Sequence, residues 1–196
     1  MQDAEVTLHE GFLAPEEADC LMRVLTEEVA WRHDRIFLYG REHPLPRLQQ
    51  WFADDGLVYT YSGIELVPPP WHPALLKLRA QIRASTQIDY NTVLANLYRD
   101  GQDAMGWHAD DEPELGGAPL IASVTLGATR DFVLRHKVRR DLPKVTVALP
   151  HGSLLLMGGA TQTHWEHALP RRKRVTEPRI NLTFRKKAGR LGVGAP

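Results

Sequence analysis

The chain has 196 residues, of which 43% are hydrophobic and 24% are charged, and its formal net charge at pH 7 is zero. This length suits one domain with a sizeable core and is short for two. The neutral charge balance argues against strong, indiscriminate binding to nucleic acids. No apolar run approaches the roughly 20 residues that a membrane helix needs, so the sequence predicts no membrane span.

The cysteine content and the first residues of the chain indicate the cellular compartment in which the protein is expected. Cys20 is the only cysteine and cannot form an internal disulfide, which fits a reducing cytoplasm. The first six residues carry two acids and no basic segment followed by an apolar stretch, so a secretory signal is not predicted. We therefore expect a cytoplasmic protein, and we expect it to act as a monomer.

Helical spacing of apolar residues occurs twice in the first half of the chain. Pro15 stands where a first helical turn tolerates proline, and apolar residues follow it at helical intervals up to Val29. A second helix is predicted from Pro73 to about Thr86, after a rigid run of three prolines. Both helices precede the segment in which the character of the sequence changes.

From Asn91 onward, short strand-like segments alternate with turn residues. The predicted strands are Thr92–Tyr98, Ile121–Leu126, Phe132–His136, Val145–Leu149, Ser153–Met157 and Ile180–Arg185. Two helices followed by many short strands are typical of an antiparallel sandwich or jelly roll with helical support. We therefore predict a mainly β, α+β fold in a single domain over residues 1–196. Residues 1–90 would be the supporting region, residues 91–187 the core, and residues 188–196 a flexible tail.

A possible metal site begins at His108 and Asp110, which stand two positions apart. In an extended segment both side chains leave the same face, so a nitrogen and a carboxylate could share one divalent metal ion. His164 or His167 could supply a third ligand. Two histidines and one carboxylate form the facial triad of Fe(II) oxygenases, although an isolated His-x-Asp is common by chance.

The segment from Pro178 to Arg185 alternates between apolar and polar residues. Ile180, Leu182 and Phe184 would face a core, while Arg179, Asn181, Thr183 and Arg185 would face the other way. Two arginines on an interior face are costly to bury without anionic partners, and a dicarboxylate ligand would satisfy them. The alternative is an edge strand with a solvated polar face. Asn96 and Tyr98 share one face of an earlier strand and could add polar contacts to the same ligand.

Taken together, six segments resemble the AlkB family of Fe(II), 2-oxoglutarate-dependent dealkylases, in the same order and at similar spacing. They are Asn96-x-Tyr98, His108-x-Asp110-Asp111-Glu112, Ile121-Ala122-Ser123-Val124, Arg130-Asp131-Phe132, His164-Trp165-x-His167-x-Leu169-Pro170 and Arg179-Ile180-Asn181-Leu182-Thr183-Phe184-Arg185. The stretch from Gly56 to Gly63 is similar to the members that repair DNA. About the first 35 residues and the tail match only weakly.

This resemblance implies a fold, a set of cosubstrates and a role for each matching residue. The fold would be a double-stranded β-helix (jelly roll) with two supporting N-terminal helices. Fe(II) would be held by His108, Asp110 and His167, with His164 on the opposite face of a strand. The residues that would hold 2-oxoglutarate are Asn96, Tyr98, Arg179, Thr183 and Arg185. With O2, the enzyme would couple decarboxylation of 2-oxoglutarate to removal of a methyl group as formaldehyde.

The substrate that the resemblance implies is an alkylated base in DNA, such as 1-methyladenine or 3-methylcytosine, taken out of the stack. Asp111 would meet the base, Tyr59 and Tyr61 would bound it, and Arg130 is carried over with them. A hairpin around Tyr39, Gly40 and Arg41 would probe the duplex, and the basic run from Arg135 to Arg140 would contact phosphates. The alternatives are a related demethylase of RNA or protein, and a non-oxidative metal-binding jelly-roll sensor.

Overall fold

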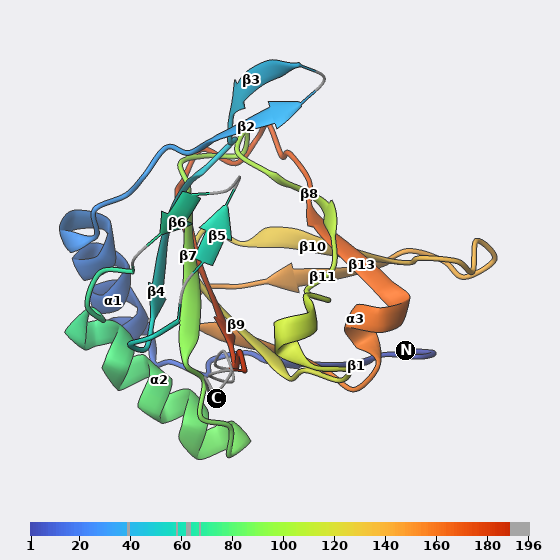
Figure 1. Ribbon diagram of the computed structural model, residues 1–196, viewed down its shortest axis with the longest axis horizontal. Coiled ribbons are helices and arrows are strands. Elements are labelled where there is room, and N and C mark those ends of the chain that lie inside the picture. The colour runs from blue at the N-terminus through green and yellow to red at the C-terminus, as the bar shows by residue number, and fades with distance from the viewer. Residues whose placement is uncertain (39, 58, 62–63, 67, 189–196) are drawn as a thin grey trace, which may run out of the picture.

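The computed structural model describes residues 1–38, 40–57, 59–61, 64–66 and 68–188 (Figure 1). Both predicted helices are confirmed, as α1 (Pro15–Glu28) and α2 (Pro73–Thr86). In the part of the chain so described, no helix has the length and apolar character required to cross a membrane. The strands form two larger antiparallel sheets and two small hairpins.

The large sheet carries the core. Within the described residues its strand order is β1-β12-β9-β14-β7-β4. The bounds are β1 (Glu5–His9), β12 (Ser153–Gly158), β9 (Ile121–Gly127), β14 (Arg179–Arg185), β7 (Thr92–Tyr98) and β4 (Leu48–Ala53). Because β14 pairs with β7 on one side and with β9 on the other, it is a central strand. The alternative of a solvated edge strand is therefore wrong, and both faces of β14 are interior.

Helices α1 and α2 cover one face of this sheet (Figure 1). Leu25 of α1, Leu75 and Ile82 of α2, and Phe184 of β14 are fully buried in one apolar cluster. Replacing one such leucine by alanine typically costs about 2–5 kcal/mol, since the cavity closes only partly. The helices thus hold β14 by its apolar side chains, which leaves its polar side chains on the opposite face.

A second sheet faces the polar side of β14. Its order is β11-β10-β13-β8 within the described residues, with bounds β11 (Val145–Leu149), β10 (Arg130–His136), β13 (Trp165–Leu169) and β8 (Met105–His108). Short helical segments, a 3-10 turn (Pro113–Leu115) and α3 (Thr161–His164), lie between strands. Side chains from both sheets line one pocket, so the site lies inside the predicted jelly roll.

The first ninety residues do more than support the core. β1 pairs with β12 and β4 pairs with β7, so this region supplies two strands of the large sheet that the sequence did not predict. It also forms two hairpins, β2 (Arg35–Leu38) with β3 (Arg41–Pro44) and β5 (Tyr59–Tyr61) with β6 (Ile64–Leu66). The β2–β3 hairpin lies at the top of Figure 1, on the far side of the molecule from α2. The tail from residue 189 lies outside the described residues.

Candidate active site

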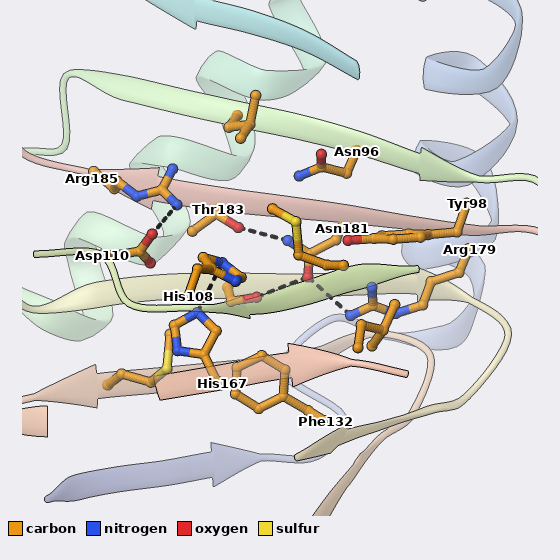
Figure 2. Close-up of a pocket in the computed structure, with 15 residues that line it drawn as sticks. Asn96, Tyr98, His108, Asp110, Phe132, His167, Arg179, Asn181, Thr183 and Arg185 are labelled. Carbon is orange, nitrogen blue, oxygen red and sulfur yellow. Dashed lines mark hydrogen bonds and ion pairs between the residues drawn. The ribbon is translucent and has the colours of Figure 1, made fainter. Parts of the chain in front are cut away.

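Three side chains converge where the second sheet meets the pocket. His108 ends β8, His167 lies directly opposite it in β13, and Asp110 follows two residues after the end of β8. Their nearest ligand atoms all lie within 4.8 Å of one another, and the two Nε2 atoms are 3.2 Å apart. Figure 2 shows the three side chains pointing toward one point. The structure therefore brings together the three residues expected to hold a metal ion.

His164 lies away from this cluster, for a reason that differs from the expected one. It ends α3 rather than occupying the opposite face of a strand, because β13 begins only at Trp165. Its ring stacks on that of His136, with centroids 5.7 Å apart. Of the two histidines left open by the spacing argument, His167 is the one beside His108 and Asp110.

The protonation states of the three residues fit a divalent cation. Nδ1 of His108 lies 2.8 Å from the carbonyl oxygen of Gly106, and a nitrogen that bonds there carries the proton, which leaves Nε2 free to bind a metal. Burial, assisted by nearby His108, lowers the pKa of His167 to about 3, so this imidazole is neutral. Burial alone would raise the pKa of Asp110, but Arg185 and the two histidines outweigh it and hold that pKa below its usual range. Two imidazole nitrogens and one carboxylate are the donors of an Fe(II) facial triad.

One oxygen of the Asp110 carboxylate is already engaged. Arg185 donates from its NH2 group to Oδ1 of Asp110 at 2.6 Å, and the side chains of this pair are 12% and 5% exposed. That contact leaves Oδ2 for a metal ion. Arg185, which was predicted to hold 2-oxoglutarate, thus orients a metal ligand in this structure.

The other end of the pocket contains a buried cation without an acid. Arg179 is 1% exposed, and burial lowers its pKa to about 10. It donates to Oγ1 of Thr125 at 2.8 Å and to Oδ1 of Asn181 at 2.9 Å, while its Nε has no hydrogen-bond partner. Among the ion pairs of the described residues, none joins a carboxylate to Arg179. Burying an unpaired charge is costly, so this end of the pocket fits an anionic ligand.

The remaining residues expected around 2-oxoglutarate line the same pocket. The Tyr98 ring centre lies 5.4 Å from the Arg179 guanidinium carbon. Oγ1 of Thr183 accepts from the Asn181 amide at 2.6 Å, and Oδ1 of Asn96 accepts from Arg47 at 2.8 Å. Figure 2 shows Arg179 and Arg185 at opposite ends of the pocket, with Thr183 and Asn181 between them.

Three residues of this site were not singled out from the sequence. Asn181 joins the pocket by accepting from Ser123 and Arg179 and by donating to Thr183. The alternation of β14 placed Asn181 on the correct face, so that signal was present. Ser123 on β9 stands in one of the six segments that resemble the family, but it was given no role there. Arg47 before β4 is marked by no local pattern.

A wider pocket adjoins the first one and shares His108, Asp110 and Arg185 with it. Its cavity volume is about 360 Å³, against about 40 Å³ for the inner pocket. Arg32, Asp34 and Arg47 contribute to its polar wall. The inner pocket therefore suits a small, tightly held ligand, and the outer one has the size of a site for a larger substrate.

Several residues expected at the substrate lie in the two small hairpins or beyond the described residues. Gly40 takes a positive φ of 74° in the turn between β2 and β3, and Arg41 is exposed. Tyr39 lies outside the described residues. Tyr59 and Tyr61 are in β5, but the placement of their side chains also lies outside what the structure describes.

Asp111 and Arg130 differ sharply in their surroundings. The Asp111 side chain is 59% exposed, and its Oδ2 accepts from Lys137 at 2.8 Å. Arg130 is 1% exposed and donates to the backbone carbonyls of Asp100, Asp103 and Pro170. The expectation that Arg130 contacts substrate is corrected by this placement, because its guanidinium ties two loops together inside the protein.

The basic run from Arg135 to Arg140 is partly neutralised by neighbouring acids. Arg135 pairs with Glu166, Lys137 with Asp111, and Arg139 with Asp141. An exposed pair such as Arg139 with Asp141 typically contributes only about 0.2–1 kcal/mol, so a phosphate could displace its carboxylate. The side chains of Arg135 and Glu166 are less exposed, at 30% and 22%.

Comparisons with known proteins agree with this geometry. A family model described as the 2OG-Fe(II) oxygenase superfamily matches residues 5–185. A Mus musculus protein named DNA oxidative demethylase ALKBH2 is 46% identical over 179 residues, which are 87% of this chain and 75% of that protein. Homo sapiens alpha-ketoglutarate-dependent dioxygenase alkB homolog 3 is 40% identical over 190 residues, which are 93% of this chain and 66% of that protein.

A solved structure described as that of OsALKBH1 shows a similar fold. Its TM-score is 0.64 at 21% sequence identity, and the match covers 92% of this chain and 97% of that one. This likeness confirms the predicted mainly β fold with its antiparallel sheets. The two relatives above are longer than the chain described here, which spans 75% and 66% of their lengths.

Proposed function

Because the chain belongs to the 2OG-Fe(II) oxygenase superfamily and, within it, to the AlkB family, we propose that it repairs DNA by oxidative demethylation. It is an Fe(II)- and 2-oxoglutarate-dependent dioxygenase, and O2 is its other cosubstrate. The observation that carries the proposal is a complete His-Asp-His cluster in the same pocket as a buried Arg179 that no carboxylate of the described residues pairs with. A wider pocket then opens next to that cluster.

The roles of the protein's own residues follow from these positions. His108, Asp110 and His167 hold Fe(II), and Arg185 keeps the Asp110 carboxylate charged and oriented. Arg179 pairs with a carboxylate of 2-oxoglutarate, while Tyr98, Asn96 and Thr183 complete that pocket. When bound, Fe(II) with 2-oxoglutarate and O2 supplies the oxidation of the N-methyl group, whose hydroxylated form breaks down to formaldehyde and the normal base.

A charged base explains how the enzyme distinguishes damage. A methyl group at N1 of adenine or at N3 of cytosine makes the base cationic at neutral pH. Asp111 directly follows the ligand Asp110, and its exposed carboxylate is available to such a base once it exchanges Lys137 for it. A carboxylate at the base edge favours the cationic, damaged form over the neutral one. Tyr59 and Tyr61 are proposed to bound the base, with stacking worth about 1–3 kcal/mol for each base.

DNA is favoured over RNA or protein by the relatives, since those named ALKBH2 are described as DNA oxidative demethylases. The β2–β3 hairpin with Gly40 at its turn supports a role in probing a duplex. A non-oxidative sensor is disfavoured because all three metal ligands and the buried Arg179 are present. We also propose that the protein acts as a monomer in the cytoplasm, where its single cysteine would stay reduced.

The test is formaldehyde release from synthetic oligonucleotides that carry 1-methyladenine or 3-methylcytosine. Single- and double-stranded DNA and RNA of the same sequence are compared with a methylated peptide. The proposal expects release from DNA above all, dependent on Fe(II) and 2-oxoglutarate. Release from RNA or peptide alone would assign the enzyme to another substrate. Failure to turn over 2-oxoglutarate with any substrate would favour the sensor.

A further inference from the structure

The short helix α3 is fixed to its surroundings at both ends. Thr161 Oγ1 donates to the carbonyl of Gly158 at 2.6 Å and accepts from the Glu5 amide at 2.9 Å. At the other end, the Lys137 amide donates to the carbonyl of His164 at 2.8 Å. The Lys137 ammonium also donates to the carbonyl of Gln162 at 2.8 Å. A helix of four residues has no stability of its own, so these contacts decide where it lies.

The side chain that α3 directs inward is that of Gln162, which is 2% exposed. Its Oε1 accepts from the backbone amide of Asp110 at 2.9 Å. Its Nε2 lies 3.7 Å from the sulfur of Met157, which is only a weak acceptor. Burying a glutamine is unfavourable unless its polar atoms are bonded, so the contact with Asp110 is the one that accounts for its position.

Asp110 needs such a partner because no strand holds it. The two histidines face each other in paired strands, where the ladder between β8 and β13 fixes their backbones. β8 ends at His108, so the Asp110 backbone lies beyond the last regular strand pairing. Gln162 bonds its backbone, and Arg185 bonds its carboxylate. Asp110 is thus fixed at both its main chain and its side chain.

We propose that Gln162 is a positioning residue for the Asp110 metal ligand, replacing the missing strand contact with one side-chain hydrogen bond. The inference rests on the proposed function, since it assumes that Asp110 binds the metal. Gln162 touches neither metal nor substrate. Loss of its acceptor frees the Asp110 backbone, so metal binding would then include the entropy cost of ordering that backbone. Loss of such an outer-shell partner typically weakens metal binding about 10–100-fold.

The experiment measures the affinity of the purified protein for Co(II) by titration, without nucleic acid or turnover. Gln162→Met keeps the length and removes the acceptor, and we expect Co(II) binding to weaken by about 10–100-fold. Gln162→Glu retains an oxygen that can accept from the Asp110 amide, and it should recover most of the affinity. Gln102→Met makes the same change at an exposed glutamine and should leave the affinity unchanged.

Three results would overturn the proposal. One is native affinity in Gln162→Met, and another is equal weakening in Gln162→Met and Gln162→Glu. The third needs no variant, and so stands even if Gln162→Met fails to fold: an Asp110 amide that exchanges with solvent hydrogen as freely as an unstructured one. A native protein that binds no Co(II) at all would instead remove the metal site, and the proposed function with it.

Discussion

Replacing Arg179 by methionine removes a buried charge while keeping a side chain of similar length. Arg179 is 1% exposed, and within the described part of the chain its guanidinium donates hydrogen bonds only to the neutral groups of Thr125 and Asn181. We propose that its charged partner is a carboxylate of 2-oxoglutarate. Arg179→Met should therefore weaken the binding of 2-oxoglutarate. It should not disturb the metal ligands, which lie nearer the other end of β14.

The expected size of this effect follows from the burial of the pair. Removing one partner of a buried ion pair typically costs about 3–5 kcal/mol. Since about 1.4 kcal/mol corresponds to a factor of ten, KM for 2-oxoglutarate should rise roughly a hundredfold to a few thousandfold. The cosubstrate-free protein should not lose stability, because replacing an unpaired buried charge by an apolar side chain is often neutral or favourable.

The assay is steady-state turnover as a function of 2-oxoglutarate, together with a Co(II) titration and a thermal melt. Arg83→Met, at an arginine of α2 whose side chain is 64% exposed, is the matched control and should behave like the native protein. If KM in Arg179→Met stayed within a few-fold of the native value with metal bound, Arg179 would not be the cosubstrate's anchor. Arg185 would then be the better candidate.

The remaining predictions concern the metal, the base and the pH. Alanine in place of any of the three metal ligands should abolish Fe(II) binding and turnover, whereas His164→Ala should retain both. Metal content and formaldehyde release are the measurements. If His164→Ala lost the metal and His167→Ala kept it, the third ligand would be His164. Asp111→Asn should lose activity on cationic lesions far more than on neutral ones such as ethenoadenine, while Tyr61→Ala should weaken both alike; equal losses for Asp111→Asn would refute the electrostatic argument. Burial lowers the pKa of His167 to about 3, below its usual range. The unfolded state then binds the extra proton first, so metal-free protein should lose stability as pH falls from about 6.5 toward 3. Urea unfolding at several pH values should show that the free energy of unfolding falls less steeply with decreasing pH in His167→Asn than in the native protein. An identical dependence on pH would show that His167 does not contribute to it.

Local patterns were enough to predict the central strands and both long helices. The alternation in β14 separated Arg179 from Phe184 correctly because a strand's side chains alternate whatever surrounds it. The helices α1 and α2 begin at Pro15 and Pro73, where proline fits a first turn. These features depend on residues close together in the sequence.

The features that were missed depend on contacts between distant segments. β1 alternates between polar and apolar residues, but it has only five residues and three of them are exposed, so the pattern was too short to be used. β4 shows no clean alternation. α3 is too short for helical periodicity, which is why His164 was placed in a strand.

Individual polar residues were the hardest to assign. Gln162 bonds a backbone amide 52 positions away, and Arg47 bonds an amide oxygen 49 positions away. Arg130 has its partners 27 to 40 positions away, and only the fold shows that they are backbone carbonyls. The family resemblance led us to predict that Arg130 contacts the substrate, whereas in the structure Arg130 is buried and bonds the backbone.

The most direct test of the central claim follows one methylated base through the reaction. A DNA oligonucleotide with a single 3-methylcytosine is incubated with the protein, Fe(II), 2-oxoglutarate and O2, and its intact mass is measured alongside succinate and formaldehyde. The account predicts conversion to the unmethylated oligonucleotide with equal amounts of both products, and none of the three with Asp110→Ala. An oligonucleotide that keeps its methyl group while the native enzyme produces succinate would contradict it.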